Sequence, residues 1–139
     1  MAKPRHVLVF GTFDKLHPGH LDFFRQAKSR GDYLIVVVGR DKTVFFRKRR
    51  WPQQSEQKRL KKIQNVSFVN QAVLGYPSEQ IEEQLQIIKE LRPEVICLGY
   101  DQRPNAAELK ELLEKQGIGG IEIETLKAYH PEKFKSSKL

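Results

Sequence analysis

The sequence holds a single cysteine, Cys97, which excludes an intrachain disulfide framework and is typical of a reducing cytosol. No apolar run approaches the roughly 18 residues that a membrane-spanning helix needs, and no segment has the features of a signal peptide. We therefore expect a cytoplasmic protein without a membrane anchor. Neither Gly-x-x-x-x-Gly-Lys-Ser/Thr nor Gly-x-Ser-x-Gly occurs, which argues against a P-loop and against an esterase-type serine.

Positive charge is what the sequence has in excess. Among 139 residues, 25 are Lys or Arg and 17 are Asp or Glu, so the net charge is +8. The length suits one domain over residues 1–139, and the charge favours an anionic partner such as a nucleotide, a phosphate or a nucleic acid. Much of the excess lies in Arg47–Arg50 and in residues 127–138.

Strand-like and helix-like patterns alternate along the chain. Apolar runs predict strands over 6–10, 33–38, 66–74, 94–98 and 120–126, and helical spacing predicts helices over 19–30, 55–63, 78–91 and 105–117. This alternation predicts an α/β fold with a Rossmann-like, doubly wound, five-stranded parallel sheet, in which the first and fourth strands are neighbours. Residues 40–54 show no clear period, and we expect a long basic loop or flap there.

The stretch from Phe10 to His20 lies where the first strand ends and the first helix begins. Pro18 suits a first helical turn, Gly19 lets backbone approach a ligand, and a helix N-terminus favours an anion. His17 and His20 add hydrogen-bond donors for phosphate oxygens. Zinc is disfavoured because it needs three or four ligands and few other His or Cys residues exist. The stretch predicts a phosphate cradle, with backbone at Thr12 and Phe13 holding a nucleotide.

Three nearby features each have two interpretations. Asp14 is either a cap at the approach to the helix or a contact to the acceptor or nucleotide. Arg47–Arg50 either closes over a triphosphate or forms a solvated basic turn, and Arg59 is either a phosphate ligand or a surface residue. The predicted strand order also brings Gly99–Gln102 close to the histidines.

The motif Gly11-Thr12-Phe13-Asp14 followed by His17-Pro18-Gly19-His20 resembles the signature of the nucleotidyltransferase superfamily, and the resemblance runs along almost the whole chain. It implies direct nucleotidyl transfer with His17 and His20 as the catalytic residues. The expected nucleotide-binding set is Gly11, Thr12, Phe13, His17, Gly19, His20, Arg49, Arg59, Gly99, Tyr100, Asp101, Ser136 and Ser137. Asp14 and Asp41 are the expected acceptor-binding residues.

Further segments sharpen this resemblance. Glu56-Gln57-Lys58-Arg59 looks like the family's Glu-x-x-Arg segment, whereas Asn70 and Gln71 stand where the family usually has two acids. Gly99-Tyr100-Asp101-Gln102 looks most like the archaeal-type FAD synthases. Lys135–Leu139 resembles a Ser-Thr-Ser-Lys-Ile motif that opens a last helix, and because the sequence stops at Leu139 we expect that helix to be missing or one turn long.

The resemblance implies an FMN adenylyltransferase, which makes FAD from FMN and ATP. A divalent cation, usually Mg²⁺, is expected to be held mainly by the triphosphate, with no metal site of protein ligands, and a homodimer is expected because family members often dimerise. Candidates for stacking on the flavin ring are Tyr100, Phe45, Phe46 and Trp51. The alternatives are a cytidylyltransferase that uses CTP and a phosphorylated alcohol such as glycerol 3-phosphate, and a non-enzymatic basic module that binds a nucleotide or RNA.

Overall fold

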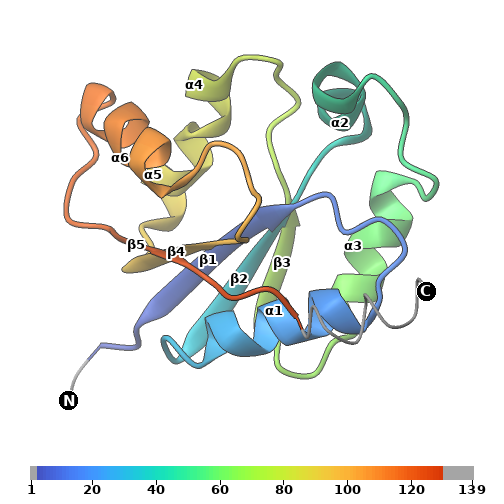
Figure 1. The fold of residues 1–139 in the computed structure, drawn as a ribbon, viewed down its shortest axis with the longest axis horizontal. Helices are drawn as coiled ribbons and strands as arrows, with labels where there is room; N and C mark the ends of the chain where they lie inside the picture. Colours follow the sequence, from blue (N-terminus) through green and yellow to red (C-terminus); the bar gives the residue numbers. More distant parts are fainter. Residues whose placement is uncertain (1–2, 130–139) are drawn as a thin grey trace.

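Within residues 3–129, the part of the chain that a computed structural model describes, five strands form one sheet. The strands are β1 (His6–Gly11), β2 (Tyr33–Val38), β3 (Gln71–Leu74), β4 (Val95–Leu98) and β5 (Glu122–Thr125). They lie in the order β3-β2-β1-β4-β5, and every neighbouring pair is parallel (Figure 1). The predicted doubly wound, five-stranded parallel sheet is confirmed, including the pairing of the first and fourth strands.

Helices cover both faces of the sheet. They are α1 (Pro18–Lys28), α2 (Asp41–Lys48), α3 (Glu56–Gln64), α4 (Ile81–Gln84), α5 (Gln86–Leu91) and α6 (Ala106–Lys115). α1 and α3 pack on one face and α5 and α6 on the other, whereas α2 and α4 stand near the edge where the strands end (Figure 1). None of the helices in residues 3–129 is long and apolar enough to cross a membrane.

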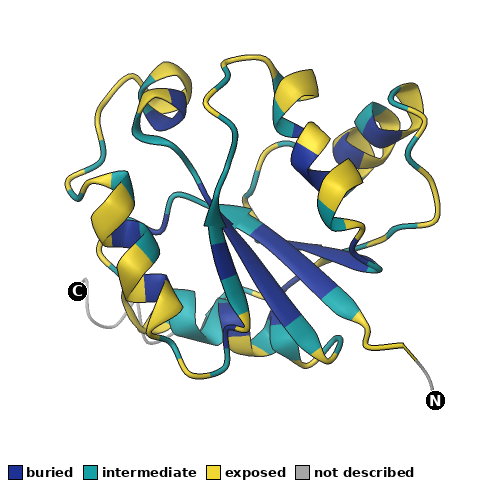
Figure 2. Ribbon diagram, turned by 180° about the vertical axis from the view of Figure 1, so that it is seen from behind, coloured by how far each residue is buried: buried dark blue, intermediate teal, exposed yellow. Residues whose placement is uncertain are grey.

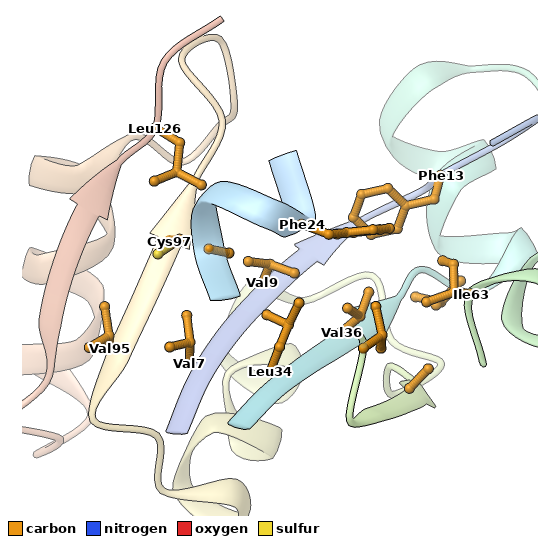
Figure 3. Close-up of a cluster of buried hydrophobic side chains, with 14 residues drawn as sticks. Val7, Val9, Phe13, Phe24, Leu34, Val36, Ile63, Val95, Cys97 and Leu126 are labelled. Atoms are coloured by element: carbon orange, nitrogen blue, oxygen red, sulfur yellow. The ribbon is translucent and has the colours of Figure 1, made fainter. Parts of the chain in front are cut away.

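Alternate residues of the central strands supply the two hydrophobic cores. Val7 and Val9 of β1 pack with Phe24 of α1 (Figure 3), whereas Leu8 between them packs on the opposite face with α5 and α6. The central strands are buried along most of their length (Figure 2). Strands buried on both faces have continuous apolar runs, which is why the sequence pattern of β2 and β4 identified them.

Residues 40–54 differ from the predicted long loop, and that prediction is wrong for the part that forms α2. This helix ends at Arg49, whose backbone is left-handed with φ 61°. Thr43 and Val44 are buried on one side of it. Tertiary packing therefore stabilises a short helix that its own sequence pattern marks only weakly.

Two other elements are shorter than predicted. The helix expected over residues 78–91 forms α4 and α5, which meet at Leu85. The third strand begins only at Gln71, because residues 66–69 form a turn in which Val69 N donates to Val66 O at 3.1 Å. Asn70 then contacts β2 with both backbone and side chain, since its N donates to Leu34 O and its Oδ1 accepts from Leu34 N. The strand itself therefore covers only the end of the predicted range.

Candidate active site

A cavity of about 1010 Å³ opens at the edge of the sheet where the strands end. Its wall comes from residues 11–14 after β1, parts of 39–48, 75–76 after β3, 99–103 after β4 and 127–129 after β5. A parallel sheet gathers these segments because all its strands point the same way. The first turn of α1 also lines the cavity, so the predicted phosphate cradle and the Gly99–Gln102 loop meet in one place.

The histidine turn, residues 17–20, begins α1. His17 is the N-cap residue with extended backbone, and Pro18 takes the first helical position. His17 Nδ1 accepts a hydrogen bond from Gly19 N at 3.1 Å, and His20 Nδ1 accepts one from His17 N at 3.3 Å. A neutral imidazole that accepts at Nδ1 carries its proton on Nε2. Both rings, which stack with centroids 3.8 Å apart and line the cavity, therefore present an Nε2–H donor.

The charge state of His20 follows from its surroundings. Burial, together with the neighbouring His17 and Lys48, lowers the pKa of His20 to about 4. The ring of Phe13 meets the His20 ring edge-on, with centroids 5.5 Å apart and an interplanar angle of 89°. His20 is consequently neutral near pH 7, and it acts on a ligand as a fixed hydrogen-bond donor rather than as a cation.

Two glycines allow the close packing of this region. A Cβ atom on Gly11 would lie 2.5 Å from Phe13 Cζ, and one on Gly19 would lie 2.8 Å from His17 Cε1. Phe13 has a left-handed backbone with φ 52°, and its ring is buried. The ring thus anchors the loop in the core.

Asp14 lines the cavity and ties the loop after β1 to the segment after α2. Its carboxylate accepts hydrogen bonds from Gln53 N at 2.7 Å and Gln54 N at 2.9 Å. Desolvation raises the pKa of Asp14, but these two N–H groups, Arg59 and Lys15 outweigh it, so the pKa lies below its ordinary value. The capping interpretation of Asp14 is wrong, because His17 is the N-cap of α1 and both Asp14 oxygens bind the segment before α3. The acceptor contact stays a prediction for a side chain that lines the cavity.

The basic run 47–50 contributes to the cavity, but through other residues than predicted. Arg47 and Lys48 line it, whereas Arg49, the residue expected to bind the nucleotide, caps the end of α2 and does not. Lys48 Nζ donates to Thr12 Oγ1 at 3.2 Å, which joins α2 to the predicted cradle. Burial lowers the pKa of Lys48, and Arg47 and Arg50 lower it further. No local pattern identified this lining face, because the segment has no clear helical period in the sequence.

Arg59 forms the centre of a buried network that we call the arginine knot, consisting of Arg59, Thr12, Gly39, Asp41 and Gln54. Its side chain is 0% exposed. The guanidinium donates to the carbonyl oxygens of Thr12 (2.8 Å), Gly39 (2.8 Å) and Gln54 (3.0 Å), and to Asp41 Oδ1 at 2.6 Å. This geometry is incompatible with direct binding of a nucleotide by Arg59, because its donors are engaged and no surface of the side chain is accessible.

Asp41, the other residue of this ion pair, also differs from its predicted place in the cavity. It does not line the cavity: its carboxylate binds Arg59 and accepts from Glu56 N at 3.3 Å, while Asp41 N donates to Glu56 Oε1 at 2.8 Å. The predicted acceptor contact at Asp41 is therefore replaced by a structural role at the start of α2. An acidic residue directly after a strand suits a binding site and a helix N-terminus equally well, and the sequence alone did not separate the two.

The loop after β4 lies at the point between β1 and β4 where the order of strands in the sheet changes direction. Gly99 N donates to Gln102 Oε1 at 3.0 Å, and Gln102 Nε2 donates to Phe10 O at 3.1 Å. This carboxamide bridges the ends of β4 and β1, and it holds Tyr100 and Asp101 at the cavity wall. The Tyr100 side chain is 67% exposed and so is accessible to a ligand.

The segment after β5 is fixed to α1 by one glutamine. Gln26 Oε1 accepts from Lys127 N at 3.1 Å, and Gln26 Nε2 donates to Lys127 O at 3.0 Å and to Asp22 Oδ2 at 2.8 Å. The chain from Lys127 to Tyr129 then lines the cavity. Sequence reasoning missed this contact, which depends on two residues far apart in the chain. Ser136 and Ser137 lie outside the described residues.

Comparison with known proteins places this site in a family. The sequence profile of the cytidylyltransferase-like family matches residues 8–139. FAD synthase of Methanosarcina barkeri is 43% identical over 81% of this chain and 76% of its own length, and FAD synthase of Thermococcus kodakarensis is 37% identical over 99% of this chain and 90% of its own length.

Solved structures agree on the fold. A lipopolysaccharide core biosynthesis protein from Thermoplasma volcanium has a TM-score of 0.82 and 34% identity, covering 91% of this chain and 99% of its own. Pantoate-beta-alanine ligase from Francisella tularensis, at 16% identity and a TM-score of 0.65, covers 98% of this chain and 66% of its own and shares the fold alone. The sheet and the histidine turn thus define a nucleotidyltransferase. The chain belongs to the cytidylyltransferase-like family.

Nucleotidyltransferases of this kind commonly use a divalent metal ion, and the cavity shows how one would be held. Among residues 3–129, no group of three His, Cys, Asp or Glu side chains is placed as metal ligands. Asp14 and Asp101 line the cavity. Mg²⁺ is usually bound by substrate phosphates together with one or two carboxylates. The described residues therefore fit a cation that enters with a triphosphate.

Proposed function

We propose that this protein is an FMN adenylyltransferase, which converts FMN and ATP to FAD and pyrophosphate. The observation that carries the proposal is the pair of imidazoles at the N-terminus of α1, each of which accepts a backbone hydrogen bond at Nδ1 and keeps Nε2 for a cavity large enough for two substrates. The names of the two relatives, which align with 81% and 99% of the chain at 43% and 37% identity, support FMN as the acceptor.

The reaction needs positioning and neutralisation of charge rather than a covalent nucleophile. A phosphate oxygen of FMN attacks the α-phosphorus of ATP, the bond from that phosphorus to the bridging oxygen breaks, and pyrophosphate leaves. His17 and His20 donate to non-bridging phosphate oxygens, where negative charge grows in the transition state. The N–H groups of the first turn of α1 and the Lys48 ammonium favour the same charge.

Mg²⁺ is the divalent ion that we propose to accompany ATP, and when bound it neutralises phosphate charge. Asp14 or Asp101 would supply a carboxylate oxygen to it from the cavity wall. Ser136 and Ser137 are proposed to add contacts to the phosphates, as the family motif implies.

The direct test measures pyrophosphate release with Mg²⁺ for the four pairings of ATP or CTP with FMN or glycerol 3-phosphate. Release with ATP and FMN, together with a chromatographic peak of FAD, is the expected result. His6 offers a matched control, because it lies at the start of β1 and contacts Glu94 away from the cavity. His20→Ala should slow FAD formation by about 10²–10³-fold, whereas His6→Ala should retain the wild-type rate.

The two alternative functions give different results in the same assay. Release with CTP and glycerol 3-phosphate would identify a cytidylyltransferase acting on a phosphorylated alcohol. A folded protein that releases no pyrophosphate, yet binds RNA with a steep dependence on salt, would be a basic binding module.

A further inference from the structure

One arm of the cavity has no role among the sequence-predicted site residues. Beyond Gly39 the cavity wall continues along α2, past the end of β3, to α4 and α5. We call this part the ring arm and define it by six lining residues, which are Arg40, Thr43, Val44, Tyr76, Gln84 and Ile87. Thr43 Oγ1 donates to Ser78 O at 3.4 Å, so α2 directly contacts the segment that leads into α4 (Figure 1).

The chemistry of the ring arm differs from that of the histidine turn. Val44 and Ile87 present apolar surface, Tyr76 presents an aromatic ring, and the charge of Arg40 is paired with Glu56 at 3.1 Å. The arm thus combines apolar walls with hydrogen-bonding groups, and its one charged lining residue is neutralised by an ion pair. Such a lining suits a flat, uncharged heteroaromatic ring better than a phosphate.

Gln84 supplies the specific polar contact. Its Nε2 donates to Ser78 O at 2.6 Å, which fixes the orientation of the carboxamide. Among the described residues, Gln84 Oε1 has no hydrogen-bond partner although the side chain lines the cavity. A half-buried carbonyl oxygen held in this way is an acceptor for an N–H group of a ligand.

Arg40 supplies complementary donors. Arg40 Nε donates to Gly75 O at 2.9 Å and Nη1 donates to Glu56, which leaves further N–H groups of this guanidinium without a partner in the described residues. The isoalloxazine ring has a dimethylbenzene end and a pyrimidine end, where one N–H lies between two carbonyl groups. The ring arm offers apolar surface for the first, and an acceptor and donors for the second.

We propose that the ring arm binds the isoalloxazine ring of FMN, with Gln84 Oε1 accepting the hydrogen bond of the ring N3–H. This inference rests on the proposed function and assigns its acceptor subsite. The loops after β4 and β5 are left for the nucleoside triphosphate, and the histidines lie where the two reacting phosphates meet. Of the aromatic residues expected to stack on the flavin, Phe45, Phe46 and Trp51 do not line the cavity; Phe45 stacks on Trp51 with centroids 4.6 Å apart.

The first experiment measures binding without turnover. FMN is titrated with protein in the absence of ATP, and the quenching of flavin fluorescence gives the Kd. Gln84→Leu should raise the Kd of FMN about fivefold to tenfold, the range of one lost hydrogen bond, while the Kd of ATP stays unchanged. Gln86→Leu is the matched control, because Gln86 lies two residues further on, is exposed and does not line the cavity. An unchanged Kd of FMN for folded Gln84→Leu would overturn the proposal.

The second experiment changes the ligand instead of the protein. N3-methyl-FMN lacks the proposed donor, so the wild-type protein should bind it about fivefold to tenfold more weakly than FMN. Gln84→Leu should bind the two flavins with similar affinity, since its side chain accepts no hydrogen bond. An equal penalty for the methyl group in both proteins would show that Gln84 does not contact N3–H and would refute the assignment.

These readouts separate the assignment from the proposed function. Wild-type protein that forms FAD, with flavin binding insensitive to Gln84, would leave the function in place and place the ring elsewhere. Wild-type protein that neither binds FMN nor forms FAD would refute both. Weakened binding of glycerol 3-phosphate to Gln84→Leu would also contradict the assignment, because that acceptor has no ring for this arm.

Discussion

The histidine turn and the arginine knot lie on either side of the loop after β1, and they use polar side chains in opposite ways. Each histidine engages Nδ1 with backbone and keeps Nε2 for the cavity. Arg59 engages its guanidinium in four hydrogen bonds and is 0% exposed. A polar residue near a binding site acts on a ligand only when it retains both an unsatisfied group and an accessible surface.

The comparison also shows how the two regions depend on each other. Arg59 holds the carbonyl oxygen of Thr12, while Thr12 Oγ1 accepts from Lys48 in the cavity. Asp41, which Arg59 also binds, begins the helix that carries Lys48. The arginine knot therefore fixes the backbone on which the site is built, although the Arg59 side chain itself has no exposed surface.

The largest effect is expected from breaking the knot. Arg59→Ala leaves Asp41 and the carbonyl oxygens of Thr12 and Gly39 without their shared donor in a buried place. We expect the free energy of unfolding to fall by about 3 kcal/mol, the lower end of the range for a buried ion pair, because Arg59 is fully buried whereas Asp41 is partly exposed. Urea denaturation measures this loss. A variant with wild-type stability and weakened binding of ATP would instead support the sequence-based prediction that Arg59 is a nucleotide ligand.

The histidine turn should behave in the opposite way. His20→Ala removes one Nε2–H donor from the transition state, and we expect kcat to fall about 10²–10³-fold, as for the loss of one preorganised donor. Unfolding should be affected by at most about 1 kcal/mol, the scale of a lost capping contact. Steady-state kinetics and urea denaturation on the same preparation test both statements. Wild-type turnover, or a loss of stability as large as that for Arg59→Ala, would contradict the division of roles.

A smaller effect is expected from a substitution that shifts the His17 ring but keeps it in the histidine turn. A Cβ on Gly19 would lie 2.8 Å from Cε1 and 3.1 Å from Nδ1 of His17, so Gly19→Ala must displace that ring or the turn. We expect kcat to fall roughly tenfold, because a catalytic group shifted by a fraction of an ångström loses alignment. Gly119→Ala is the matched control, since a Cβ there meets nothing within 4 Å. Equal kinetics of the two variants would show that the ring position is not critical.

Much of the fold followed from the sequence because buried parallel strands have a strong local pattern. The runs Tyr33–Val38 and Glu94–Leu98 identified β2 and β4, and alternation with helices predicted the parallel sheet. The histidine turn was equally visible, because Pro18 and the two histidines occupy fixed positions of one helical turn. These features depend on residues that are close together in the chain.

The features that the sequence left undecided depend on contacts between distant residues. Whether Arg59 and Asp41 face a ligand or each other is set by the contacts of Asp41, at the start of α2, with the first turn of α3, and no local pattern encodes them. α2 was missed because burial of two residues, rather than a strong period, stabilises it. The sequence did not identify Gln84 as a site residue, because Gln84 reaches the cavity only through the arrangement of α4 beside α2.

The smallest effect concerns the charge of His20. Its pKa is lowered from 6.5 to about 4 by burial and by His17 and Lys48, so between these values the unfolded chain binds more protons than the folded one. Stability should therefore be complete above pH 6.5 and should fall as the pH decreases toward 4, by on the order of 1 kcal/mol for this partly exposed ring. His20→Gln, which is neutral at every pH, should remove that part of the slope in urea denaturation between pH 4 and 7.

The same low pKa predicts that turnover shows no ionisation of His20 between pH 6 and 8, because the Nε2–H donor is present throughout that range. A slope that persists unchanged in His20→Gln would show that folding does not lower the pKa of His20, and would contradict the burial of this ring as a control on its charge.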